Sequence, residues 1–531
     1  MATRGCDAGF VLRLSVPSSV GWGKILKQFW LGFYASVPER HAPQAVGGRR
    51  ITGFSACVSG DYQFSTWVPG AFFLPGVGEI PLAGWSTDRL YYGNLKFELQ
   101  NNAGMAAAFL RRRKNKRKPP LPYTASPLQL LGADILLVLK SLWSLPGIIL
   151  PLNPSTLDEL DELYPSWENL FALAMHVCLA MCQVVFLLSL LVCFFSMVPA
   201  LWIFLYAVAF VWANRAICSW VLNTSDGILQ SQVAIEERPE HEREHWIFIN
   251  GVAVGNHWLQ NNIDRLAYTF GRRITGVHNP TDGLVFDIIE CLIQRTFTFA
   301  TPDTRDGYAI TKATLLNPKY EKVVLILHSQ GGIEGSLIID WLLDELPEDI
   351  LRKLEVYTFG NAANHFNNPF KSLLGLKQPS TDGSTIPYQN ASGQANKSVL
   401  HIEHYVNALD FVCVWGVLQF ASVPNRYMGR IFVRPGSGHQ LNQHYLDAMF
   451  TLGPDRKVLD TNEFMEMGAK SVAYEKIRPK HARYARDEVL ITSGRSVRDE
   501  HEDNIRGPLK VRDISRLWQY RNGGSPADDI K

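Results

Sequence analysis

A serine, an aspartate and a histidine each follow a stretch with strand character, in that order along the chain. Ser329 lies in the sequence HSQGG, directly after an apolar run. Asp410 follows the stretch His401–Asn407, and His439 ends the glycine-rich sequence PGSGH. A serine hydroxyl becomes a nucleophile when a histidine takes its proton and a carboxylate orients that histidine. These three residues therefore predict acyl transfer through a covalent serine intermediate.

The surroundings of Ser329 predict a strand, a tight turn and a helix. Val323–Leu327 is a short apolar run rich in β-branched residues, typical of a parallel strand buried on both faces. After the turn, apolar residues recur three or four positions apart: Ile333, Leu337, Ile338 and Leu342. This is the layout of a nucleophile elbow, in which the turn lifts the serine above the sheet. Gly331 fits it, because a side chain there would collide with the neighbouring strand.

One position departs from the usual G-x-S-x-G pattern of such elbows. Leu327 stands two residues before the serine, where glycine is usual, and a bulkier residue fits only if the adjacent structure leaves room. A glycine-rich structural turn or a P-loop-like turn is the alternative. No G-K-[ST] sequence follows, so phosphate binding is not expected.

The donors of an oxyanion hole are expected in two loops. The backbone N–H of Gln330 follows the nucleophile and lies at a helix N-terminus, where partial positive charge favours an oxyanion. The second donor is expected from Gly251 and Val252, in the turn after the first strand of the block (INGVAVG). The side chain of His328 is expected to shape the pocket, together with Gly331.

Two histidines are candidates for the base. His439 lies in a glycine-rich loop after the stretch Ile431–Val433, and His444 follows five residues later in NQHYL. We prefer His439 and expect the other to be structural. Asp410 is preferred as the carboxylate, and a helix cap or turn residue is its alternative interpretation.

The sequence HSQGG resembles the elbow of α/β-hydrolase-fold lipases and esterases. The block Ile247–Leu446 is similar to a fungal group of membrane-associated, serine-hydrolase-like proteins. This resemblance implies an α/β-hydrolase-like, doubly wound, mostly parallel sheet. The alternation of strand and helix patterns from His245 to Val433 independently predicts a parallel sheet. No cysteine or histidine spacing indicates a zinc site, so we expect no metal and no cofactor.

A long uncharged segment precedes this block. From Leu170 to Ala213 the chain contains no Asp, Glu, Lys or Arg over 44 residues, whereas one membrane span needs about 20. A turn at Ser196–Pro199 would divide the segment into a transmembrane hairpin with two spans, 170–195 and 199–221. A hairpin that dips into the membrane without crossing it is a variant, and a buried helical pair is the alternative.

The region before the hairpin combines positive charge with an interrupted apolar stretch. Residues 111–118 (RRRKNKRK) carry seven positive charges, which favours a cytosolic juxtamembrane anchor over a nucleic-acid patch. The stretch Leu128–Leu150 contains Asp134, Lys140 and Pro146, so we expect an interfacial helix instead of a span. We expect both termini in the cytosol, at an endomembrane.

Composition sets the remaining limits. The 52 basic and 50 acidic residues give a net charge of +2, which offers no support for nucleic-acid binding, and the eight scattered cysteines suggest a reducing compartment. We divide the chain into a low-information region 1–110, the basic and interfacial segment 111–168, the hairpin 169–222, the hydrolase-like block 228–450 with a surface insertion 369–397, and a polar tail 451–531. Residues 228–244 are expected to be a linker.

Two functions are weighed. The favoured hypothesis is a membrane-anchored serine hydrolase acting on a lipid or other acyl ester, because an anchor beside the site suggests a substrate reached from the bilayer. The alternative is a non-catalytic hydrolase-fold scaffold or tether at a membrane. A transporter is disfavoured, since two spans without an internal charge offer no path for an ion.

The uncharged segment generates the first prediction. The full-length chain should remain in the membrane pellet after an alkaline carbonate wash, because an exposed, mostly apolar segment of 44 uncharged residues exceeds what a soluble surface tolerates. A chain starting near Ile228 should become extractable, since the block has its own strand and helix pattern. Release of the full-length chain by carbonate would mean that the segment is a buried core.

Overall fold

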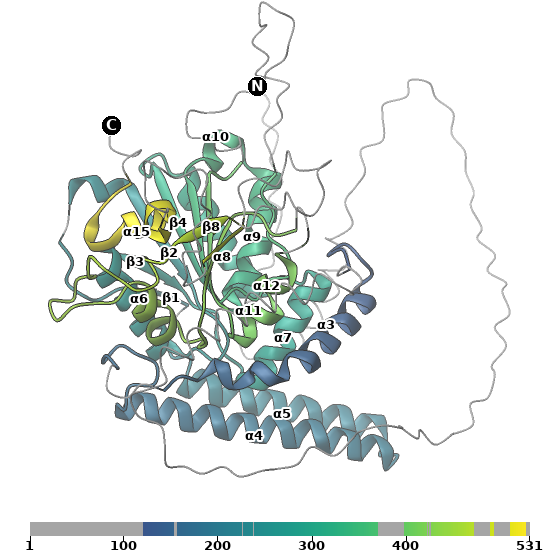
Figure 1. Ribbon diagram of the computed structural model, residues 1–531. Helices are drawn as coiled ribbons and strands as arrows, with labels where there is room; N and C mark the ends of the chain where they lie inside the picture. The colour runs from purple at the N-terminus through teal and green to yellow at the C-terminus, as the bar shows by residue number, and fades with distance from the viewer. Residues whose placement is uncertain are drawn as a thin grey trace, which may run out of the picture.

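The computed structural model describes residues 121–152, 157–225, 227–236, 238–369, 398–421, 423, 426–471, 489–492 and 510–526. At the centre of these residues lies a nine-stranded sheet with the order β1-β3-β2-β4-β5-β6-β7-β9-β8 (Figure 1). From β3 to β9 in this order the strands run parallel, and each edge strand pairs antiparallel. The strands are β1 (Ile228–Gln230), β2 (Glu244–Ile249), β3 (Ile274–Val277), β4 (Lys322–His328), β5 (Leu354–Phe359), β6 (His401–Asn407), β7 (Arg430–Arg434), β8 (Ala469–Ser471) and β9 (Val489–Thr492). The α/β class with a mostly parallel sheet is therefore confirmed.

The chain changes direction across the sheet between β2 and β4. It leaves β2 through α6 (Asn256–Phe270) to reach β3, then returns past β2 through α7 (Leu284–Phe297) and α8 (Pro302–Leu316) to β4. The helix α9 (Gly331–Glu345) packs with α8 against β4. In open parallel sheets the loops at the carboxyl ends of two such strands diverge and leave room for a site. The loops after β2 and β4 are the ones that carry the expected oxyanion donors and Ser329.

Shorter helices complete the described residues. They are η2 (Pro239–Arg243), α10 (Glu348–Leu351), α11 (Phe411–Trp415), α12 (Val417–Phe420), the π-helical η4 (Leu441–Leu446), α13 (Asp447–Met449), α14 (Val511–Ile514), α15 (Arg516–Gln519) and η7 (Arg521–Gly523).

The segment before the hairpin packs against the sheet domain. It forms α3 (Pro127–Ser141) and η1 (Leu142–Ile148), and α3 contacts both α7 and α11. Asp134 is buried, and its carboxylate lies 3.1 Å from Nη2 of Arg295 on α7. The charge that argued against a span therefore has a partner in the domain. We call residues 127–151 the strap.

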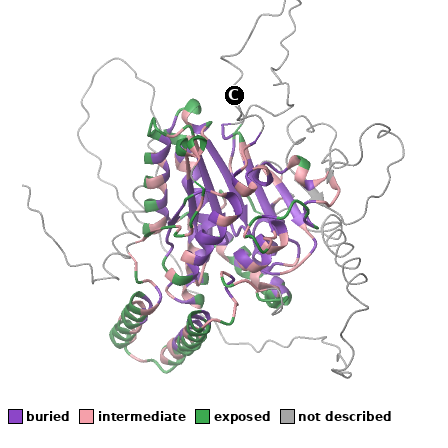
Figure 2. Ribbon diagram, turned by 90° about the vertical axis from the view of Figure 1, so that its left-hand side faces the viewer, coloured by how far each residue is buried: buried purple, intermediate pink, exposed green. Residues whose placement is uncertain are grey.

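The helices α4 (Trp167–Phe195) and α5 (Ala200–Val221) lie side by side (Figure 1), and we call this pair the hairpin. Its outward residues are exposed (Figure 2), and α4 contacts α7. By length and composition, three of the described helical stretches could cross a membrane: α3 together with η1, α4, and α5. The sequence predicted two, because it counted Asp134 and Lys140 against the first.

Polar contacts join the two sides of the hairpin insertion. Glu162, in the segment just before α4, is buried and accepts hydrogen bonds from Asn442 N (3.0 Å) and from Asn262 Nδ2 (2.9 Å) on α6. Asn169 Oδ1 on α4 accepts a hydrogen bond of 2.8 Å from Trp258 Nε1, also on α6. A domain boundary at residue 228 cuts through these contacts, so a chain starting near Ile228 would lack partners that the sheet domain uses.

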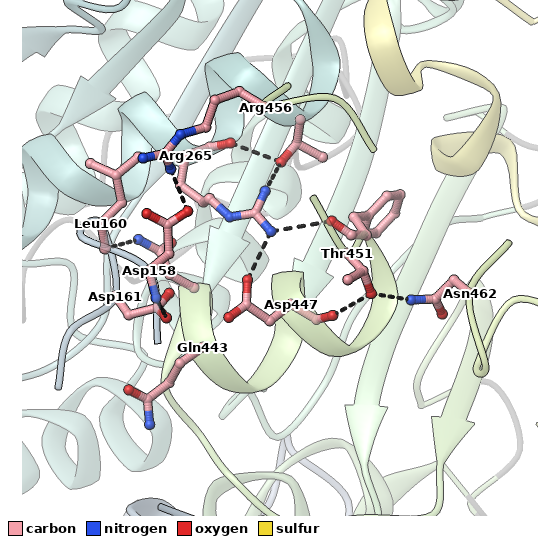
Figure 3. A network of polar contacts seen from close by, with 12 residues as sticks. Asp158, Leu160, Asp161, Arg265, Gln443, Asp447, Thr451, Arg456 and Asn462 are labelled. Carbon is pink, nitrogen blue, oxygen red and sulfur yellow. Dashed lines mark hydrogen bonds and ion pairs between the residues drawn. The ribbon is translucent and has the colours of Figure 1, made fainter. Parts of the chain in front are cut away.

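The proposed boundary at residue 451 also cuts through a network (Figure 3). Arg265 on α6 is 1% exposed at its side chain and donates to Asp447 Oδ1 at 2.9 Å. Thr451 Oγ1 donates to the carbonyl of Asp447 at 2.7 Å and accepts from Asn462 Nδ2 at 2.7 Å. Arg456 reaches Asp158, which lies before the hairpin. Residues on both sides of the expected domain thus belong to the same unit.

Two expectations about peripheral segments are wrong. Residues 228–244 are not simply a linker, because they contain β1, which pairs with β3. Residues 451–531 are not simply a polar tail, because β8 and β9 extend the sheet and α14 and α15 dock on it, as the sequence suggested only for Val511–Tyr520.

Burial alone would raise the pKa of Glu355, but Arg516 beside it, with His401 and Lys322, lowers that pKa to about 2. The regions 1–110 and 111–118 lie outside the described residues, as does nearly all of the insertion 369–397.

Glu162 allows a test of the domain boundary. Glu162→Ala leaves the N–H of Asn442 and the amide of Asn262 buried without their acceptor, which should cost on the order of 1–3 kcal/mol of unfolding free energy. Glu162→Gln keeps one acceptor oxygen and should cost less. Thermal unfolding in detergent measures both, and equal midpoints for wild type and Glu162→Ala would contradict a role for this contact.

Candidate active site

The turn at Ser329 has the geometry of a nucleophile elbow. Ser329 directly follows β4 and has a φ of 56°, in the left-handed region that a non-glycine residue enters only at a cost. Its N–H donates to the carbonyl of Phe359 on β5, and its carbonyl accepts from the N–H groups of Gly332 and Ala362. A Cβ added to Gly331 would lie 2.5 Å from the carbonyl oxygen of Ile249, which agrees with the collision expected from the sequence.

The room for Leu327 comes from the helix that follows the elbow. Leu327 is completely buried, and a Cβ added to Gly335 on α9 would lie 2.2 Å from its Cδ1. The glycine missing from the position two before the serine is thus matched by a glycine six residues after it. The departure from the usual pattern is accommodated by close packing between β4 and α9.

Ser329, His439 and Asp410 lie in a row, with the histidine between the serine and the aspartate. His439 Nε2 is 2.8 Å from Ser329 Oγ, and His439 Nδ1 is 2.7 Å from Asp410 Oδ2. A carboxylate can only accept from Nδ1–H, so Nε2 is left free to accept the proton of the serine hydroxyl. Gly360 leaves space for the pair, because a Cβ there would lie 2.9 Å from His439 Cε1.

Asp410 combines the two roles that the sequence left open. It is fully buried at the N-terminus of α11, where Oδ1 accepts the N–H of Val412 at 2.8 Å. Its Oδ2, which faces His439, also accepts from the hydroxyl of Tyr445 at 2.7 Å and from Cys413 Sγ at 3.3 Å. The carboxylate is therefore held in place by donors other than the histidine. No sequence pattern indicated Tyr445, which lies 35 residues from Asp410, or Cys413, which follows Asp410 by three residues on α11.

His444 has structural partners instead of a place beside the serine. Its Nδ1 accepts the N–H of Gln440 at 3.1 Å, so Nε2 carries the proton and donates to the carbonyl of Pro151 at 3.1 Å. Burial lowers the pKa of this imidazole to about 4. The structure thus brings His439, the preferred candidate, to Ser329, and uses the alternative to attach the strap.

The backbone of His439 is held from two sides. His328 donates from Nε2 to the carbonyl of His439 at 2.9 Å, and burial together with His439 lowers the pKa of His328 to about 3, so it stays neutral. On the other side, the N–H groups of Gly438 and His439 donate to the carbonyls of Gly147 and Ile148 in the strap, at 2.7 and 3.1 Å. The strap was expected at the membrane interface, and its contact with the loop that carries His439 (the histidine loop, residues 435–440) was not predicted.

The loop expected to supply the second oxyanion donor lies against Ser329. A Cβ added to Gly251 would come 2.4 Å from Ser329 Cβ. Within the part of the chain that the structure describes, the N–H groups of Gln330 and Val252 have no protein acceptor. The side chain of Gln330 turns away and donates to Glu290 and Gln294. These backbone groups are the available oxyanion donors.

The site is shielded from water. The exposed fraction is 2% for Ser329, 5% for His439 and zero for Asp410. Hydrogen bonds to a developing oxyanion are stronger where water is excluded. In the described ranges no three His, Cys, Asp or Glu side chains are grouped so that they could hold a metal ion.

Comparison with known proteins gives no assignment. The sequence matches no protein-family model, and no curated protein matches it significantly. A function for this chain therefore has to be inferred from the geometry of the site itself.

The packing of Leu327 against Gly335 can be measured. Gly335→Ala should destabilise the protein by about 1–3 kcal/mol, because the new methyl overlaps a buried leucine. In the double variant with Leu327→Ala, the methyl occupies space that the leucine vacates. Denaturant unfolding should then give a loss smaller than the sum of the single losses.

A matched control is Gly132→Ala in α3, where no heavy atom lies within 4 Å of an added Cβ. This substitution should be neutral or slightly stabilising, because alanine favours the helix over glycine. Additive losses for Leu327→Ala and Gly335→Ala would show that the two residues do not compensate one another.

Proposed function

We propose that this protein is a serine hydrolase of the α/β-hydrolase type, anchored to a membrane, which cleaves an ester-type acyl substrate. The observation that carries the proposal is the row from Ser329 Oγ to His439 Nε2, at 2.8 Å, and from His439 Nδ1 to Asp410, at 2.7 Å. The strained backbone of Ser329 at the end of a central parallel strand supports it.

The reaction follows from the hydrogen bonds of the site. Ser329 Oγ attacks the carbonyl carbon while its proton passes to His439 Nε2, and Asp410 stabilises the imidazolium. The oxyanion receives hydrogen bonds from the N–H groups of Gln330 and Val252. The imidazolium then protonates the leaving alcohol, which departs and leaves an acyl-serine. A water molecule gives a proton to His439 and attacks the acyl carbon. His439 then returns this proton to Ser329 Oγ as the bond between Oγ and the acyl carbon breaks, which releases the acid and the free serine.

The membrane part of the proposal depends on the hairpin. Both ends of a hairpin lie on one side of a membrane, and the basic residues 111–118 indicate the cytosolic side of an endomembrane. The outward faces of α4 and α5 are apolar and exposed, as a lipid environment requires. A site on a domain that contacts this hairpin suits a lipid or other acyl ester taken from the bilayer.

The scaffold alternative depended on Leu327 and on the uncertain histidine. Gly335 gives Leu327 its space, and His439 lies within hydrogen-bond distance of the serine. Both observations support the hydrolase over a non-catalytic tether.

The experiment that tests this function is labelling of the full-length chain in membranes by a fluorophosphonate probe. The wild type should be labelled, and Ser329→Ala should not, while expression and membrane association stay the same. His439→Ala should also abolish labelling, because the serine loses its base. His444→Ala is the matched control and should keep most of the labelling, since that imidazole binds Gln440 and Pro151.

Asp410→Asn should slow turnover of a chromogenic ester by on the order of 10⁴. Labelling that persists in Ser329→Ala would contradict the elbow, and an unlabelled wild type would favour the scaffold.

A further inference from the structure

One loop lies between the hairpin and the loop of the expected oxyanion donor. This connecting loop, residues 279–283, follows β3 and leads into α7. Gln183 on α4 is completely buried and donates from Nε2 to the carbonyl of Asp282 at 2.7 Å. Its Oε1 accepts the N–H of Val285, in the first turn of α7, at 3.1 Å. Both polar groups of this buried glutamine therefore have hydrogen-bond partners, although the helix around it is mostly apolar. Its side-chain oxygen is bonded to the start of α7, and its side-chain nitrogen is bonded to the connecting loop.

The second helix of the hairpin holds the same loop. Asn214 on α5 donates from Nδ2 to the carbonyl of Asp282 at 2.7 Å. Its neighbour Arg215 makes a two-point ion pair with the carboxylate of Asp282, through Nε at 2.8 Å and Nη2 at 2.7 Å. Gly283 is required for the close approach, because a Cβ there would lie 2.4 Å from Gln183 Nε2 and its φ is 95°. These contacts fix the position of the connecting loop relative to the hairpin.

On its other side the connecting loop is bonded to Asp287. One oxygen of this carboxylate, Oδ1, accepts the N–H of Asp282 at 2.8 Å. The other oxygen, Oδ2, accepts the hydroxyl of Thr281 at 2.6 Å and the N–H of Ala253 at 2.8 Å. A single buried side chain therefore joins the connecting loop to the loop Gly251–Ala253.

Ala253 needs this support. Its φ is 56°, so it lies in the left-handed region without the freedom of glycine. The N–H that Asp287 accepts belongs to the peptide plane directly after Val252. Fixing that plane limits the rotation of Val252, whose own N–H is the expected oxyanion donor. An oxyanion hole is effective only when its donors are held before charge develops.

We propose that Asp287 is a positioning residue for the oxyanion loop, and that Gln183, Asn214 and Arg215 of the hairpin hold the connecting loop to which Asp287 is bonded. This inference rests on the proposed hydrolase function and deepens it, because the membrane hairpin then takes part in forming the active site. Burial raises the pKa of Asp287 to about 7, whereas the donors around it favour the ionised carboxylate.

The test uses the full-length chain in membranes, with p-nitrophenyl butyrate as the ester and the fluorophosphonate as the label. Asp287→Asn keeps the shape of the side chain but replaces an acceptor oxygen with a donor. We expect kcat to fall about 10- to 100-fold, since loss of one oxyanion donor costs on the order of 10²–10³ and a displaced donor costs less. KM should change little, because the interaction strengthens only in the transition state.

The pH profile separates positioning from other effects. His439 and Asp410 do not contact Asp287 in the described structure. Above about pH 8, where Asp287 with its pKa of about 7 is ionised in the wild type, the ratio of wild-type to Asp287→Asn kcat/KM should therefore not change with pH. A disturbed triad would make that ratio depend on pH. A purely structural defect would lower the amount of folded, labelled protein without lowering kcat per labelled site. Either result would overturn the inference.

Gln183→Leu tests the hairpin side and remains informative if Asp287→Asn does not fold. It should lower kcat several-fold while the chain stays in the membrane pellet. Met181→Leu, on the exposed face of the same helix, is the matched control and should behave as the wild type. The double variant Asp287→Asn with Gln183→Leu should lose little more than Asp287→Asn alone, because both act through one loop. Additive losses would show two independent effects and contradict the link.

The outcomes distinguish the inference from the function on which it rests. A labelled wild type with an unlabelled Ser329→Ala supports the hydrolase. Unchanged kcat in both Asp287→Asn and Gln183→Leu against that background would overturn only the role of Asp287 and the hairpin. A wild type that is not labelled would overturn both.

Discussion

The turn at Ser329 depends on how closely three other backbone segments can approach it. Gly251 lies against the serine itself, Gly331 lies against the carbonyl end of β2, and Gly360 lies against the imidazole of His439. At each position an added Cβ would come within 3 Å of a neighbouring atom. The distances of the row Ser329–His439–Asp410 are therefore set by backbone contact, so even one added methyl group would displace a partner. The pairing of Leu327 with Gly335 follows the same rule one layer below.

The site is formed by parts of the chain from both sides of the hairpin. The strap receives the N–H groups of Gly438 and His439, and Glu162 receives the N–H of Asn442 just beyond them. The hairpin is therefore an insertion within the unit that carries the candidate site, with packing contacts before and after it, and not an appendage at its edge. Its own polar residues continue this arrangement, since Gln183 and Asn214 are bonded to the loop that enters α7.

Much of the central domain could be predicted from the sequence. Strand β6 has the predicted bounds, and β4 and β7 extend the predicted apolar runs by one residue at each end, because short apolar runs flanked by polar turns leave little choice. The order along the chain was sufficient to select Ser329, Asp410 and a histidine after them. It could not decide between His439 and His444. That choice depends on the contact of His444 with Pro151, which is tertiary. The strap was expected at the membrane interface, because its charged residues would be costly inside a bilayer. A single sequence cannot show that Asp134 pairs with Arg295 in the domain. The short strands β1 and β8 were missed since three residues carry too little pattern.

The attachment of the strap has a consequence for synthesis on the ribosome. Pro151 and His444 are in contact but lie 293 residues apart in the sequence. The strap leaves the ribosome before the hairpin, whereas its partners Gly438, His439 and His444 are made much later. At elongation rates of about 5–20 residues per second, the strap carbonyls of Gly147, Ile148 and Pro151 wait on the order of tens of seconds for those partners. A hairpin inserted as it is made would hold the strap at the membrane surface during that interval, and assembly of the site would then require docking between two distant parts of one chain beside the bilayer.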